Sequence, residues 1–80
     1  MATRFVTLPA DQSWVEVTTA TEWLLQAVSS PIQVHIGPSA PAAGAAYHVI
    51  AGGQGLTSVV AGGVYARAHT ARETIVSVSD

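Results

Sequence analysis

The stretch Ile32-Gln33-Val34-His35-Ile36 has the cleanest alternation of apolar and polar side chains in the chain, and it decides the fold class. A period of two sends successive side chains to opposite faces of a β-strand, whereas a helical face repeats after about 3.6 residues. Ile32, Val34 and Ile36 therefore share one face, which we expect to be buried. Segments on both sides of this strand extend the β prediction to the rest of the chain.

Two segments on the N-terminal side alternate in the same way. Residues 4–8 predict a first strand or an extended arm, which Pro9 ends. Residues 13–18 predict a strand with Val15 and Val17 on one face and Trp14 on the other. One face of this second strand should be buried.

Residues 19–28 allow two interpretations. Thr19 and Glu22 have the spacing of a helix capping box, and a short helix would follow them. The run is short, however, and Ser29-Ser30-Pro31 is typical of a turn that leads directly into the strand at 32–36. We therefore favour a hairpin of residues 23–28 with residues 32–36.

The C-terminal half consists of short apolar runs between glycine and proline segments. Residues 37–44 form a loop, because their two prolines each remove a backbone donor. Residues 47–50, 56–60 and 64–68 predict strands, with the glycine pairs between them as tight hairpin turns. Residues 73–79 predict a last strand. Its buried face would carry Thr74, Val76 and Val78.

These segments predict an all-β fold, a small antiparallel β-sandwich or barrel of six to eight short strands. Residues 1–80 form a single β domain, in which residues 1–12 are the candidate extended N-terminal arm.

The composition indicates a protein that shares its surface with neighbours. Hydrophobic residues make up 49% of the chain and charged residues only 10%, against roughly 25% in ordinary soluble domains. There is no cysteine to supply a disulfide, and a domain of this size has a thin core. We therefore expect an oligomer, with a monomer covered by Ser, Thr, Gln and Gly as the alternative.

Charge and hydropathy exclude two classes of partner. The chain has no lysine, and its three arginines are outnumbered by five acids, so binding of nucleic acid through phosphates is not expected. Its apolar runs fall short of the about 18 residues of a membrane-spanning helix, so no membrane partner is expected.

The residues that usually carry chemistry are scattered. Gly52-Gly53-Gln54-Gly55 lacks the lysine and following helix of a phosphate-binding loop. His35, His48 and His69 lack the paired spacing of a zinc site, although an approach of His35 and His48 across neighbouring strands stays open. We expect no catalytic residue, no metal ligand and no cofactor, and hence no enzyme.

Large rigid side chains are the best candidates for an interface. The candidates are Trp14, Trp23, Tyr47, Tyr65 and Arg67. At least one tryptophan should belong to the core and at least one tyrosine should face a partner. Arg67 could pair with an acid on a neighbouring subunit.

The order of these segments resembles that of small β-rich virion proteins of tailed bacteriophages, among them capsid decoration, cement and head-fibre proteins. The resemblance covers residues 13–79. It lies in Ser13-Trp14-Val15-Glu16-Val17, residues 24–37, Ser39-Ala40-Pro41, residues 64–68 and the valine-rich last strand.

The resemblance implies a structural protein of the virion, made in the bacterial host cytoplasm, that stabilises the capsid as a decoration or cement protein. Its implied partners are itself, as a homotrimer, and the major capsid protein or another virion protein. The alternative is a tail, fibre or baseplate module that binds a host receptor or glycan by stacking on Trp and Tyr.

Overall fold

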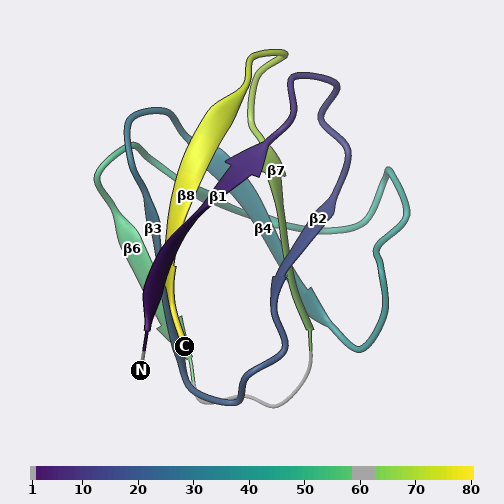
Figure 1. The fold of residues 1–80 in the computed structure, drawn as a ribbon. Helices are drawn as coiled ribbons and strands as arrows, with labels where there is room; N and C mark the ends of the chain where they lie inside the picture. The colour runs from purple at the N-terminus through teal and green to yellow at the C-terminus, as the bar shows by residue number, and fades with distance from the viewer. Residues whose placement is uncertain (1, 59–62) are drawn as a thin grey trace.

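The computed structural model of the protein describes residues 2–58 and 63–80, which contain eight strands and no helix (Figure 1). No helix long and apolar enough to cross a membrane is therefore found in the described residues. The strands are β1 (Thr3–Leu8), β2 (Val15–Thr18), β3 (Trp23–Ala27), β4 (Ile32–Gly37), β5 (His48–Ile50), β6 (Gly55–Ser58), β7 (Gly63–Ala68) and β8 (Thr74–Ser79).

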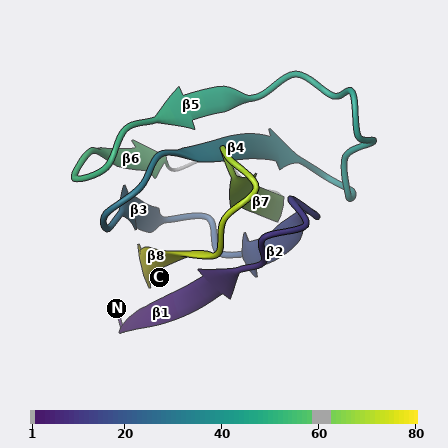
Figure 2. The same cartoon turned by 90° about the horizontal axis from the view of Figure 1, so that it is seen from above.

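The strands form two antiparallel sheets that face each other (Figure 2). One sheet has the order β1-β8-β3-β6 and the other the order β2-β7-β4-β5. The predicted all-β fold is confirmed. Of the two architectures that the sequence left open, the two separate sheets correspond to the β-sandwich.

The hydrogen-bonded pairs are nested around the middle of the chain. β4 pairs with β5, β3 with β6, β2 with β7 and β1 with β8. At the outer end of this ribbon Ala2 and Asp80 exchange two backbone hydrogen bonds of 3.1 Å, so the two ends of the described chain lie side by side (Figure 1). Eight strands nested in this order and folded into two sheets have the topology of a jelly roll.

The core fills the space between the sheets. Its side chains come from the inward positions of seven strands, where the alternation of the sequence places apolar residues. They are Leu8, Val17, Trp23, Leu25, Ala27, Ile32, Val34, Ile50, Val64, Ala66, Val76 and Val78. Val6, Val15, Ile36 and Leu56 pack against this cluster from its margins.

The segments with two interpretations are both strands. Residues 23–27 form β3 rather than a helix, and residues 3–8 form an edge strand paired with β8 along its full length rather than a free arm. In β2 the register shifts between Glu16 and Thr18. This irregularity explains why Val17 and Thr18 are both buried although they are neighbours.

The predicted hairpin of residues 23–28 with 32–36 is wrong. Both segments are strands, but β3 pairs with β8 and β6, whereas β4 pairs with β7 and β5. The turn at 28–31 crosses from one sheet to the other, and the two strands bury their apolar faces against each other. Alternation shows that a strand has an apolar face. It does not show whether the next strand pairs with it in the same sheet or packs against its apolar face from the opposite sheet.

The first glycine pair, Gly52-Gly53, is also not a hairpin turn. β5 and β6 belong to different sheets, so the connection between them crosses the sandwich, and β6 and β7 likewise belong to different sheets. Gly53 does have the expected positive φ, 87°, and its N–H donates to the carbonyl of Ala27 at 2.8 Å. Most of the second glycine turn lies in residues 59–62, outside the described residues. The proline-containing loop after Gly37 joins the one consecutive pair of described strands that are hydrogen-bonded to each other, β4 and β5.

The inward positions should dominate the free energy of unfolding. Val34 is fully buried, while Val49 is 52% exposed on the neighbouring strand. We expect Val34→Ala to lower the unfolding free energy by about 2 kcal/mol, because it removes buried methyl groups and leaves a cavity. Val49→Ala should cost less than about 1 kcal/mol. Urea unfolding of both variants checks this, and equal losses would contradict the assigned faces.

Candidate functional site

The outer face of the β2-β7-β4-β5 sheet, here called the aromatic face, gathers most of the candidate residues. The strand register sets Glu16, Tyr65 and His35 in one row across β2, β7 and β4. In the next row Arg67 lies opposite Gln33. Trp14, just before β2, and Tyr47, just before β5, add the aromatic rings on the two sides.

Arg67 is the centre of this face. The carbon atom of its guanidinium group lies 4.2 Å from the centroid of the Trp14 ring and 5.5 Å from that of Tyr47. Its Nε donates to Oε1 of Gln33, and Nη1 donates to the carbonyl of Ala43 at 3.3 Å. The cation therefore lies within reach of two π-systems, which attract it electrostatically. No carboxylate of the described residues lies within ion-pair distance of it.

The loop between β4 and β5 is anchored to this face. His35 Nδ1 donates to the carbonyl of Ala46 at 2.8 Å, and Arg67 holds Ala43 of the same loop. The rings of His35 and Trp14 are tilted, with centroids 6.0 Å apart. A shallow depression forms beside the loop and is lined by Val34, His35, Ile36, Ala46, Tyr47 and His48. His35 and His48 thus share a depression, but no group of three or more His, Cys, Asp or Glu in the described residues could hold a metal ion.

Tyr65 is the least exposed of the aromatic residues on this face. Its side chain is 8% exposed, and burial together with the neighbouring Glu16 carboxylate raises the pKa of its hydroxyl group. Tyr47, in contrast, is 43% exposed. Tyr47 is therefore the tyrosine that faces solvent. Tyr65 is nearly buried and lies between Glu16 and His35 in their row.

The sequence candidates fall into two groups. Trp14, Tyr47, Tyr65 and Arg67 lie together on the aromatic face, whereas Trp23 is 2% exposed and belongs to the core. Gln33 and His35 complete the face and were not among the candidates. The signal for them is the alternation of residues 32–36, which places both side chains opposite the apolar face.

The outer face of the other sheet, here called the uncharged face, has a different character. Its outward positions in β1, β8, β3 and β6, extended by Val28 just after β3, follow from the register. They are Thr3, Phe5, Thr7, Leu24, Gln26, Val28, Gly55, Thr57, Ile75, Ser77 and Ser79. None of these described positions carries an ionisable side chain. Phe5, at 73%, is the most exposed large hydrophobic residue among those described.

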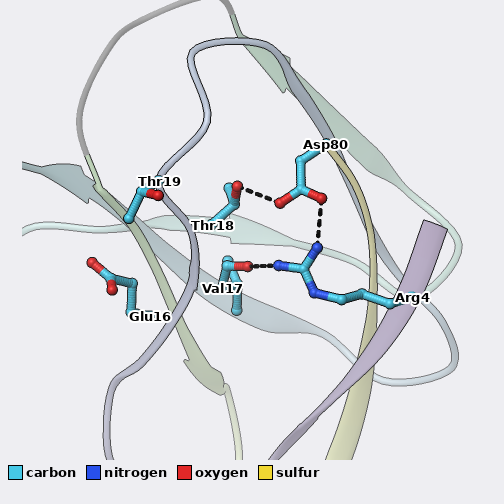
Figure 3. A pocket seen from close by; sticks show the side chains of 6 residues that line it. All are labelled: Arg4, Glu16, Val17, Thr18, Thr19 and Asp80. Atoms are coloured by element: carbon cyan, nitrogen blue, oxygen red, sulfur yellow. Dashed lines mark hydrogen bonds and ion pairs between the residues drawn. The ribbon is translucent and has the colours of Figure 1, made fainter. Parts of the chain in front are cut away.

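A polar network closes one end of the sandwich (Figure 3). Arg4 donates to Asp80 and to the carbonyl of Val17, and the Thr18 hydroxyl donates to Asp80 at 2.6 Å. These bonds join β1 and the end of β8 to β2 in the opposite sheet. With Glu16 and Thr19 the same residues line a shallow polar depression. Because its polar groups bond to one another, we assign this network a structural role.

The chain matches no protein-family model, no curated protein and no solved structure.

The network at Asp80 predicts a loss of stability in acid. The hydrogen bond from Arg4, followed by that from Thr18, lowers the pKa of Asp80 below its usual 3.8. A carboxylate whose pKa is lower in the folded state stabilises the protein above the unfolded pKa, and this stabilisation is lost as the pH falls through the folded pKa.

We expect the unfolding free energy of the wild type to fall as the pH decreases from about 5 through the lowered pKa of Asp80. Asp80→Asn should flatten this part of the profile, and the exposed-residue control Glu73→Gln should leave it unchanged. Urea unfolding across the pH range is the measurement. A profile that Asp80→Asn does not alter would contradict the assigned network.

Proposed function

We propose that the protein is a structural component of a bacteriophage particle, a decoration or cement protein that stabilises the head through oligomeric contacts. The observation that carries the proposal is the uncharged face. It carries no charged side chain at its described positions, and four exposed large hydrophobic residues lie among its Ser, Thr and Gln side chains: Phe5, Leu24, Val28 and Ile75. Exposed apolar side chains without charge are well suited to a contact with protein.

The two outer faces support different contacts. The uncharged face favours apolar and hydrogen-bonded packing against another protein surface. The aromatic face offers Arg67, a cation without a described carboxylate partner, together with the exposed ring of Tyr47. Arg and Tyr are enriched in interfaces, and an acidic group on the major capsid protein or another virion protein is the natural complement of Arg67.

A cement protein can work with contacts that are individually weak. The shell presents many copies of the same seam, and a subunit with two binding faces engages two neighbours at once. The second contact then forms at high effective concentration. Jelly rolls occur in viral capsids as well as in lectins and cupins, so the topology agrees with the proposal but does not select it.

The copy number of the protein in purified particles tests this function. Decoration requires on the order of hundreds of copies per particle, because the seams of the shell repeat with its symmetry. Quantitative mass spectrometry against the major capsid protein measures this number. A count of about a dozen or fewer would exclude decoration and would fit a tail component.

A host glycan or receptor on a tail, fibre or baseplate is the second candidate, and the exposed Tyr47 ring favours it. The near burial of Tyr65 removes that residue as a stacking platform. We expect Tyr47→Ala to weaken binding to a glycan array or to host cells by at least about tenfold. Arg72→Gln changes an exposed residue in the connection between β7 and β8, outside both outer faces, and should leave binding unchanged. No binding by the wild type would contradict this candidate.

A further inference from the structure

We propose that two copies of the protein pair through their uncharged faces, about a two-fold axis that runs parallel to the strands. This inference rests on the proposed function in that it takes assembly as the role of the protein. It adds the surface, the partner and the symmetry of the contact.

The absence of charge within the strands allows a second copy as the partner. In a two-fold contact the same patch lies on both sides, so a charged residue near the axis faces its own copy. The described positions of the uncharged face contain no such residue, so the centres of two such faces can meet without charge repulsion. The aromatic face, in contrast, carries Glu16 and Arg67 within its rows.

The acids nearest to the uncharged face precede β3 and β8. Glu22 and Glu73 are exposed, and the antiparallel register of β3 with β8 places them at opposite ends of the face. Charged groups at the rim of an apolar centre are the usual arrangement in protein interfaces.

The size of the face is sufficient for a specific contact. The strands of this face, β1, β8, β3 and β6, have six, six, five and four residues. At about 4.8 Å between strands and a rise of about 3.4 Å per residue, they give a plane of about 19 by 18 Å. Two such faces with their side chains bury on the order of 1,000 Å² in total, which is the lower limit for a specific interface. Sheets that pack face to face keep their strands within about 30° of each other, so the axis runs either close to parallel or close to perpendicular to the strands.

The relief of the face determines which way the axis runs. One row across the sheet consists of Phe5, Ser77, Gln26 and Gly55, from the edge strand β1 to the edge strand β6. The row therefore has an exposed ring at one end and no side chain at the other. An axis parallel to the strands places edge strand β1 of one copy over edge strand β6 of the other. It also places this row of one copy over the same row of the other. It lays Phe5 of each copy over Gly55 of the other.

Gly55 offers bare backbone beside an apolar side chain. A Cβ at this position would lie 3.2 Å from the carbonyl oxygen of Leu25 and 3.7 Å from Leu24 Cδ1. The neighbouring Gln26 side chain is held by its amide, which donates to the carbonyl of Gly53 at 3.1 Å. An axis perpendicular to the strands would instead set the two Phe5 rings side by side and leave Gly55 uncovered in both copies.

Light scattering on the purified protein tests the pairing. We expect the wild type to have twice the chain mass of 8.2 kDa. Ser77→Asp places a charge in the middle of the row and should give the mass of one chain. The matched control Val49→Asp places the same charge on the opposite sheet, at a residue that is 52% exposed, and should keep the double mass.

A second variant guards against a folding defect in Ser77→Asp. Phe5→Ser changes an exposed side chain on an edge strand and should weaken the dimer at least about tenfold while the circular dichroism spectrum is retained. The pairing is overturned if the wild type has the mass of one or of three chains, or if both folded variants keep the wild-type mass. These outcomes concern only the pairing, since a monomer or trimer can still be present in hundreds of copies per particle, which the copy number decides.

Discussion

The apolar faces of the strands in one sheet are buried by packing against the apolar faces of the strands in the other sheet. Leu25 and Val34, both fully buried, illustrate this, since they come from strands that follow each other in sequence but belong to different sheets. The pairing order follows from the same constraint. β4 and β5 form the central pair. The strands that flank this pair in sequence then pair with each other in turn, β3 with β6, β2 with β7 and β1 with β8.

This constraint explains what the sequence predicts well. Alternation identifies the strands and their buried faces. In the last strand Thr74, Val76 and Val78 are buried, as the pattern requires. Alternation is a property of one strand and its two sides, so it needs no knowledge of neighbours.

The same constraint explains what the sequence does not predict. The turn at 28–31 and the glycine turn at 51–54 have the composition of hairpin turns, yet both cross between the sheets. The grouping of Trp14, Tyr47 and Arg67 follows only from the pairing of β7 with β2 and β4, over long stretches of chain. Trp14 and Trp23 have similar local surroundings in sequence, and only the fold separates the face residue from the core residue.

Of the two outer faces, only the aromatic face carries charged side chains at its described positions, Glu16 and Arg67. We infer that the protein meets its own copy through the other, uncharged face. The chain has no cysteine, so disulfide formation between two single-cysteine variants measures this most directly. Thr3 and Thr57 lie at opposite ends of the row that also contains Leu24, and the proposed axis brings Thr3 of one copy over Thr57 of the other. We expect a mixture of Thr3→Cys and Thr57→Cys chains to form mixed disulfide-linked dimers faster than either variant alone. Crosslinking of the mixture at the rate of the single variants would contradict the inferred pairing.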